Sequence, residues 1–192
     1  MTMSESQVLE ALRGAGAILH GHFQLTSGRH SDTYVQCARI LEDPALTTDL
    51  ALAMADSVAG RGIDVVAAPA VGGIIIGFAV AQALGVRFIF SERQQGVMTF
   101  RRGFSLEPGE RVLVVEDVVT TGGSVAEVVD LVRAADGVVV AVTSIIDRGG
   151  KKAFDAEYLP LLRLEVESME PRFCPQCATG AVIDSPGSRR LS

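Results

Sequence analysis

The stretch VLVVEDVVTTGGS, residues Val112–Ser124, decides the fold of this chain. An apolar run rich in valine ends in two adjacent carboxylates, Glu116 and Asp117, and two valines later the composition changes to hydroxyl groups and glycines. From Gly123 onward the apolar residues have helical spacing. A buried strand that enters a helix through such a turn is typical of a parallel α/β sheet, in which ligands bind beyond the carboxyl ends of the strands.

Strand and helix patterns alternate on both sides of this stretch. Apolar runs predict strands over residues 63–70, 86–92, 111–117, 138–146 and 158–166, and helical patterns predict helices over 73–85 and 123–135. Two more helices are predicted near the N-terminus, one capped by Ser4 with Gln7 and ending near Gly14, the other beginning after Asp43 and ending at Gly60. We therefore expect an α/β fold with a doubly wound parallel sheet flanked by helices, formed by one domain over residues 1–192.

Charge and cysteine content bear on partners and compartment. The formal charge is −6 and the isoelectric point is near 5.1, which argues against a nucleic-acid partner. Three cysteines are too few for a disulfide framework, and the first residues lack the features of a signal peptide, so a cytoplasmic location is expected. Residues 65–86 carry no charge and are long enough to span a membrane, but Pro69 and three glycines interrupt them, so a buried strand and helix are favoured and no membrane association is expected.

The turn Thr120–Ser124 has the composition of a phosphate site. Glycines allow the backbone to approach an anion, the first amides of the following helix point at it, and hydroxyl groups donate further hydrogen bonds. An ordinary strand-to-helix turn with a capping hydroxyl would explain only one of these residues. A nucleotide-binding P-loop is excluded because no Gly-Lys-Ser/Thr follows.

Two other connections have open interpretations. Residues 92–111 lack helical periodicity, which fits either a functional lid or a solvent-exposed β-hairpin that only connects strands. The turn Pro69–Gly73 offers backbone amides to an oxyanion, or it is a strand-to-helix turn chosen for packing.

Val112–Ser124 resembles the phosphoribosyl-diphosphate signature of type I phosphoribosyltransferases. The resemblance implies that Glu116 and Asp117 hold the ribose hydroxyls and act in catalysis, and that the turn binds the 5-phosphate. It further implies that Mg²⁺ is the cofactor, carried by substrate and water rather than by protein ligands. The residues implied in donor binding are Glu116, Asp117, Val118, Val119, Thr120, Thr121, Gly122, Gly123 and Ser124, with Val71 and Gly72 at the diphosphate.

Three further segments, His22–Cys37, Ser91–Arg93 and Ile146–Gly150, resemble orotate phosphoribosyltransferases. The implied activity is transfer of the 5-phosphoribosyl group to N1 of orotate in pyrimidine biosynthesis. Another base such as a purine, or a regulator that senses phosphoribosyl diphosphate, is the alternative. The resemblance implies a homodimer, whose lid loop closes over the neighbouring site. It also implies a hood subdomain of residues 1–40 plus 158–183 above a core of residues 41–157.

By the same resemblance, Arg148 binds the orotate carboxylate, aided by Thr120, Thr26 and Ser27. A planar guanidinium suits a carboxylate because it forms two parallel hydrogen bonds. The alternative for Arg148 is a surface residue in a local ion pair with Asp147, worth under about 1 kcal/mol.

The chain departs from these relatives in its lysines. Many relatives have lysine where Thr26, Gly72 and Gln94 stand here, and this chain has only Lys151 and Lys152. We expect Arg93, Arg101 and Arg102 to supply the positive charge for the leaving diphosphate instead, with Arg93 in a catalytic role. Relatives also have an unusual cis peptide in the diphosphate loop, which corresponds to Ala70–Val71 here.

The histidines and cysteines offer a weaker signal. Of the three histidines, His30 is a candidate for substrate contact, and His20 and His22 are expected at the surface or in the core. Cys174-Pro-Gln-Cys177 has the spacing of half a zinc site. A tetrahedral site would require a second pair, for instance from a symmetry-related copy, so free thiols in a C-terminal turn are the default interpretation.

Overall fold

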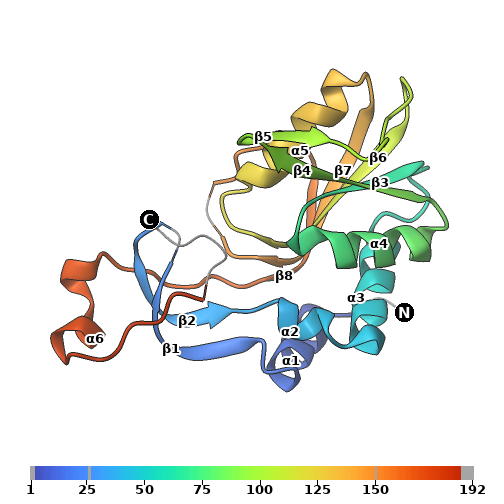
Figure 1. Cartoon of the computed structure of the whole chain (residues 1–192). Coiled ribbons are helices and arrows are strands. Elements are labelled where there is room, and N and C mark those ends of the chain that lie inside the picture. The colour runs from blue at the N-terminus through green and yellow to red at the C-terminus, as the bar shows by residue number, and fades with distance from the viewer. Residues whose placement is uncertain (1–2, 26, 150, 187–192) are drawn as a thin grey trace.

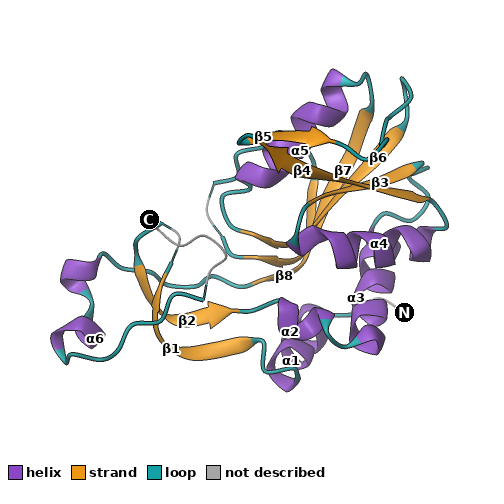
Figure 2. Ribbon diagram, viewed as in Figure 1, coloured by secondary structure: helices purple, strands orange, loops and turns teal. Residues whose placement is uncertain are grey.

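The computed structural model describes residues 3–25, 27–149 and 151–186, and its centre is a six-stranded sheet in the order β5-β4-β3-β6-β7-β8 (Figures 1 and 2). Neighbouring strands are parallel except for β5, which pairs with β4 in the antiparallel direction. The strands are β3 (Val65–Pro69), β4 (Arg87–Gln94), β5 (Val97–Phe100), β6 (Arg111–Val119), β7 (Val138–Asp147) and β8 (Tyr158–Arg163).

The strand order reverses between β3 and β6. The chain first moves outward from β3 to β4 and β5, and then returns to place β6 on the other side of β3. In open α/β sheets such a reversal separates the loops on one edge and leaves a crevice for ligands at the carboxyl ends of the two strands. The turns after β3 and after β6 are the two that the sequence predicts as anion sites.

Helices cover both faces of the sheet, as expected from its continuous apolar strands. Val65 and Ala67 of β3 pack with α5 (Gly123–Ala134), whereas Val66 packs with α3 (Pro44–Ser57) and α4 (Gly72–Leu84) on the opposite face. The two clusters of buried residues sandwich β3 and β6, whose core side chains are almost fully buried. The strand ends that carry the predicted site are therefore held on a rigid scaffold.

The N-terminal helices form where their caps predict. Ser4 and Gln7 make a reciprocal capping box at the start of α1 (Glu5–Gly14). Asp43 Oδ1 accepts hydrogen bonds from the amides of Ala45 and Leu46 at 2.9 and 3.2 Å, and Pro44 occupies the first turn of α3. Both helices begin at the predicted residues, and α3 ends three residues before Gly60.

A second, two-stranded sheet lies beside the main one. It consists of β1 (Ile18–Gln24) and β2 (His30–Val35), followed by the short helix α2 (Ala38–Leu41). The C-terminal segment, with the 3₁₀ turn η1 (Pro171–Phe173) and α6 (Pro175–Ala178), runs along this hairpin and bridges to Phe23 and His30. A lone two-stranded ribbon is marginally stable, so this packing supports it.

The five strands and two helices predicted for the core are confirmed, with boundaries that differ by at most three residues. β4 and β5 form a β-hairpin that includes residues 92–100. The hairpin turns at Gln95 and Gly96, both with positive φ. β1, β2, α2 and α6 were not predicted, whereas β5 agrees with the β-hairpin that was one of the two interpretations of residues 92–111. No helix in the described ranges has the length and apolarity needed to cross a membrane. The division into hood and core stays a prediction; α1 itself contributes Val8 and Leu12 to the main core cluster.

Candidate active site

The adjacent acids Glu116 and Asp117 lie at the carboxyl end of β6. Glu116 is buried and Asp117 is half-buried. The Asp117 amide donates to Glu116 Oε1 at 3.1 Å, and the Val118 amide donates to Asp117 Oδ1 at 2.7 Å. Burial raises the pKa of Glu116 well above its usual range, and the neighbouring Asp117 carboxylate raises it further. The pair is thus arranged to receive hydroxyl donors or positive charge from a ligand.

The turn after β3 packs directly against these acids. A Cβ atom at Gly72 would lie 2.8 Å from both carboxylate oxygens of Asp117, and one at Gly73 would lie 3.1 Å from Glu116 Oε1. Glycine is therefore required for this close approach, and a lysine at position 72 would not fit the same arrangement. The Ala70–Val71 peptide is cis, as predicted, and the Val71 side chain is exposed.

The turn after β6 has the geometry of an anion site. Gly122 has φ +78°, and a Cβ there would lie 2.6 Å from the Phe154 ring, so both conformation and space require glycine. The first amides of α5 have no partner within the helix and carry its positive dipole end. Thr120, Thr121 and Gly123 are exposed and Ser124 is half-buried, so their polar groups are available around these amides.

The two valines that precede this turn have a packing role. Val119 is buried in the cluster formed with α5, and its carbonyl accepts a hydrogen bond from the Arg148 amide at 2.9 Å. Val118 is half-buried against the opposite cluster. By this packing Val118 and Val119 position the two acids that precede them and the turn that follows them.

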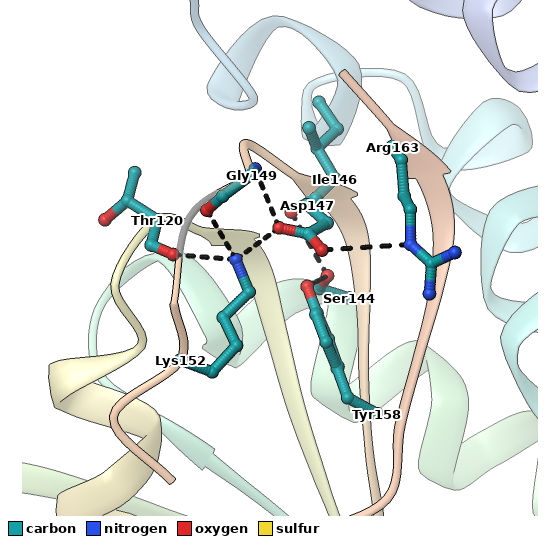
Figure 3. A network of polar contacts seen from close by, with 8 residues as sticks. All are labelled: Thr120, Ser144, Ile146, Asp147, Gly149, Lys152, Tyr158 and Arg163. Atoms are coloured by element: carbon teal, nitrogen blue, oxygen red, sulfur yellow. Dashed lines mark hydrogen bonds and ion pairs between the residues drawn. The ribbon is translucent and has the colours of Figure 1, made fainter. Parts of the chain in front are cut away.

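Lys152 joins this turn to the end of β7 (Figure 3). Its Nζ donates to the carbonyl oxygens of Thr120 at 2.8 Å and Gly149 at 2.7 Å, and it forms an ion pair with Asp147. Asp147 Oδ1 also accepts from the Gly149 amide at 2.9 Å. Lys152 was not predicted in this position, because its partners are brought together by the pairing of β6 with β7.

Arg148 follows β7 and is half-buried. Its neighbour Asp147 pairs with Lys152 and Arg163, and no ion pair between Asp147 and Arg148 is found among the described residues. Burial lowers the pKa of Arg148. Within the part of the chain that the structure describes, Arg148 Nε is a buried nitrogen without a hydrogen-bond partner. A buried unpaired donor is costly, which is consistent with a site for an anionic ligand group.

Tyr34 and Cys37 bring the end of β2 to the same place. Burial raises the pKa of both groups; the charge of Asp117 adds to the shift in each, and that of Arg148 opposes it. Tyr34, Cys37, Asp117 and Arg148 therefore share one electrostatic environment. Neither Tyr34 nor Cys37 was predicted individually, although both belong to the segment His22–Cys37.

The turn between β1 and β2 carries the remaining predicted acceptor residues. Ser27 is exposed, and its Oγ accepts from the Arg29 amide at 3.5 Å. Arg29 Nε donates to Ser168 Oγ at 2.9 Å, which fastens the turn to the C-terminal segment. The predicted role of Thr26 falls outside the described residues. His30 is buried below the turn and contacts His22 rather than an open pocket.

The three arginines predicted to bind diphosphate contact carboxylates of their own chain. Arg93 forms hydrogen bonds of 2.6 and 3.1 Å with both carboxylate oxygens of Glu127 in α5. Arg101 and Arg102 both pair with Glu92, at 3.4 and 3.1 Å. Such exposed pairs contribute only about 0–1 kcal/mol each, so an incoming diphosphate could compete for the guanidinium groups.

This combination of paired acids, glycine turns and a helix N-terminus has a counterpart among known proteins. Residues 37–159 match the family described as phosphoribosyl transferase domain. The fold and the site thus define a phosphoribosyltransferase.

Similar proteins narrow this class. An orotate phosphoribosyltransferase of Chlorobium phaeobacteroides (strain BS1) is 48% identical, with 99% of each chain covered. That of Pelotomaculum thermopropionicum is 50% identical over 98% of this chain and 100% of its own. The crystal structure of orotate phosphoribosyltransferase from Aeropyrum pernix is 26% identical and has a TM-score of 0.70, covering 82% of this chain and 93% of its own. The chain belongs to the orotate phosphoribosyltransferase family.

Proposed function

We propose that the protein transfers the 5-phosphoribosyl group of phosphoribosyl diphosphate to N1 of orotate in pyrimidine biosynthesis, at the carboxyl ends of β3, β6 and β7. The observation that carries this proposal is that three subsites lie at the same edge of the sheet, at the carboxyl ends of neighbouring strands. Glu116 and Asp117 offer acceptors to a sugar, the start of α5 offers donors to a phosphate, and Arg148 offers a guanidinium to a carboxylate.

In the proposed reaction the bond between C1 and the diphosphate oxygen breaks and a bond from C1 to orotate N1 forms, with inversion. The N1 proton passes to solvent or to the released diphosphate. As positive charge develops on the ribose, it favours the ionised form of Glu116, and the carboxylates of Glu116 and Asp117 then stabilise it electrostatically. The first amides of α5 hold the 5-phosphate, and the cradle of Val71 and Gly72 faces the diphosphate.

Mg²⁺ is part of the proposal as a cofactor. In the described ranges, Glu116 and Asp117 are not joined by a third carboxylate in a cluster that could hold a metal ion. Two adjacent oxygen donors fit an ion that is carried mainly by substrate phosphates and water, as Mg²⁺ often is. When bound there, Mg²⁺ offsets the charge of the leaving diphosphate. Glu116 and Asp117 would orient the ribose hydroxyls of the same complex.

Orotate would bind between Arg148 and the hairpin turn, with Thr120 and Ser27 beside it and Tyr34 close to Arg148. The carboxylate of orotate would satisfy the buried Nε of Arg148, which a neutral purine could not do as well. This is the feature that favours orotate over other bases within the class.

A homodimer and a cytoplasmic location complete the proposal. Ile75 and Phe78 of α4 are 52% and 60% exposed and lie one helical turn apart, next to an apolar groove lined by Phe78, Ala81, Gln82, Val86, Arg87 and Phe88. An exposed apolar surface of this kind supports self-association, which would allow the lid, residues 92–111, to reach a neighbouring site. The three cysteines are free, which suits a reducing compartment.

The test is product formation from phosphoribosyl diphosphate and orotate, followed by the change in ultraviolet absorbance of orotate, with and without Mg²⁺. We expect Mg²⁺-dependent formation of orotidine 5′-monophosphate and no product from hypoxanthine under the same conditions. Preferential use of hypoxanthine or adenine would move the protein to another branch of the class. Light scattering of the wild type and of a Phe78→Asp variant tests the dimer.

A further inference from the structure

Four potential metal ligands meet away from the proposed active site, where the C-terminal segment crosses the hairpin of β1 and β2 (Figure 1). They are His22 of β1, His30 of β2, and Cys174 and Cys177 around α6. One nitrogen or sulfur atom from each residue lies within 4.8 Å of the corresponding atoms of the other three. From the sequence, Cys174 and Cys177 were expected to be free thiols unless a second pair of ligands came from elsewhere, for instance a symmetry-related copy; in the structure His22 and His30 of the same chain lie beside them.

Four of the six distances between these atoms are close to the edges of a zinc tetrahedron. His22 Nε2 lies 3.1 Å from His30 Nδ1, 3.4 Å from Cys174 Sγ and 3.6 Å from Cys177 Sγ, and Cys177 Sγ lies 3.3 Å from His30 Nδ1. Zinc bond lengths of about 2.0–2.1 Å to nitrogen and about 2.3 Å to sulfur give tetrahedral edges of about 3.3 Å between nitrogens and about 3.6 Å between nitrogen and sulfur. All four measured edges are within a few tenths of an ångström of these values.

Hydrogen bonds within the cluster do not account for this arrangement. His22 Nδ1 lies 3.1 Å from the Ala181 carbonyl oxygen, which can only accept, so Nδ1 carries the proton and Nε2 presents its single lone pair. That lone pair faces three possible donors at once, from His30, Cys174 and Cys177. It can accept one good hydrogen bond, whereas a cation at the centre would satisfy all four ligand atoms together.

The surroundings have the features of a built metal site. The contact with Ala181 fixes the tautomer and orientation of His22, as carbonyl partners of metal-bound histidines commonly do. His22, His30 and Cys174 are buried, and Cys177 is exposed, which leaves a path for metal entry. Two thiolates and two neutral imidazoles around a divalent ion give a site without net charge, which suits burial.

We infer that His22, His30, Cys174 and Cys177 bind a structural Zn²⁺ ion. Two sulfur and two nitrogen ligands in tetrahedral geometry favour zinc over harder cations, and four protein ligands leave no open position for chemistry. The ion ties the C-terminal segment to both strands of the hairpin, a few residues from the turn that carries Ser27 and Arg29. It thus stabilises the hairpin whose turn carries Ser27, a residue that contacts orotate in the proposed function.

Metal content tests the site without reference to catalysis. The full-length chain is purified under reducing conditions without a histidine tag, dialysed, and analysed by inductively coupled plasma mass spectrometry. We expect about one zinc ion per chain in the wild type and loss of most of it in Cys174→Ser and Cys177→Ser. His20→Ala and Cys37→Ala are the matched controls; each removes a residue of the same type outside the cluster and should retain the ion.

Cobalt substitution and unfolding complete the test. Co²⁺ in the metal-free wild type should give the intense visible bands of tetrahedral coordination and a thiolate charge-transfer band, and both should be absent in Cys177→Ser. Chelation should lower the melting temperature of the wild type but not that of Cys174→Ser. The inference is wrong if reduced, correctly folded protein takes up no Zn²⁺ or Co²⁺, or if mass spectrometry finds a Cys174–Cys177 disulfide in place of the metal. If zinc binds but chelation leaves melting and proteolysis of residues 171–184 unchanged, the stabilising role is refuted.

Discussion

Lys152 Nζ donates a hydrogen bond of 2.8 Å to the carbonyl oxygen of Thr120, so a residue that follows β7 holds the first residue of the turn that follows β6 (Figure 3). The same ammonium pairs with Asp147, next to Arg148. Lys152 therefore connects the proposed phosphate and carboxylate subsites through Thr120 and Asp147.

Replacement of Lys152 with alanine should weaken binding of phosphoribosyl diphosphate. The loss of a charge-assisted hydrogen bond costs about 1.5–3 kcal/mol, which corresponds to a rise of about 10- to 100-fold in KM for the donor if the turn loosens. Steady-state kinetics at saturating orotate measure this effect. Lys151→Ala removes an exposed lysine at the adjacent position and should leave KM unchanged. Equal behaviour of the two variants would show that the Thr120 contact does not position the turn.

Gly72→Ala should impair turnover through Asp117. The added Cβ would lie 2.8 Å from the Asp117 carboxylate, so the carboxylate or the start of α4 must move. A displacement of about 1 Å at a reacting centre can cost about 100-fold in rate. We expect a loss of this order in kcat/KM for the donor, with the fold retained by circular dichroism. Gly14→Ala is the control, because nothing lies within 4 Å of a Cβ at Gly14.

Glu116→Gln should stabilise the protein while it lowers activity. The folded-state pKa of Glu116 is raised above its unfolded value by burial, so folding favours the protonated form. The contribution of Glu116 to stability is therefore full below the ordinary glutamate range and is lost as the pH rises through the raised pKa. Glutamine resembles the protonated acid and does not titrate.

The gain in melting temperature of Glu116→Gln over the wild type should thus be small in acid and grow toward neutral and alkaline pH. Differential scanning fluorimetry over a pH series measures it, with Glu107→Gln as a control at an exposed position. A gain that is independent of pH would contradict the assigned cause. Activity of the wild type should fall as the pH decreases through the same range, because the ionised acid is the form that stabilises the developing cation.

The parts of the fold that local sequence determines were predictable, and those set by distant contacts were not. Ser4 with Gln7 and Asp43 with Pro44 are local caps, and the paired acids follow directly from their strand. β1 and β2 were not predicted because their sequences, ILHGHFQ and HSDTYV, mix polar and apolar residues and lack continuous β-branched runs. Their stability comes from a segment more than 130 residues later in the chain.

The same distinction applies to the sites. Glu116, Asp117 and the turn after them are contiguous, so their chemistry was visible in one stretch of sequence. Lys152 and Tyr34 reach the site only through sheet pairing and the hairpin. His22 and Cys174, separated by 152 positions, could not be connected by any local spacing.

Arg148→Lys should affect orotate much more than the donor. Lysine keeps the positive charge but loses the planar pair of donors that a carboxylate accepts. Among the described residues, Arg148 Nε is buried and has no hydrogen-bond partner. We therefore expect orotate binding to weaken by about 2 kcal/mol, which is a rise of about 30-fold in KM for orotate. KM for phosphoribosyl diphosphate should change little. If both constants rose together, Arg148 would be a structural residue rather than a ligand of the base.

The arginines of the lid should act on turnover through the leaving diphosphate. Arg93 pairs with Glu127 and Arg101 and Arg102 pair with Glu92 in the free protein, so each must leave a carboxylate to reach a phosphate. A triple variant with alanine at all three arginine positions should have a kcat about 100-fold lower, since charge stabilisation at a leaving group is worth several kcal/mol. Arg61→Ala, which breaks a surface ion pair with Glu157, is the control.

Glu127→Gln tests whether the ion pair between Arg93 and Glu127 competes with the binding of diphosphate by Arg93. This change removes the competing carboxylate but keeps the side-chain volume, so Arg93 becomes free to bind the diphosphate without first breaking an ion pair. KM for the donor should fall by a factor of a few, consistent with a surface pair worth about 0–1 kcal/mol, and the effect should shrink at high salt.

Unchanged turnover in the triple arginine variant would refute the hypothesis, because another group would then have to neutralise the diphosphate. An unchanged KM in Glu127→Gln together with a slow triple variant would instead assign the function to Arg101 and Arg102.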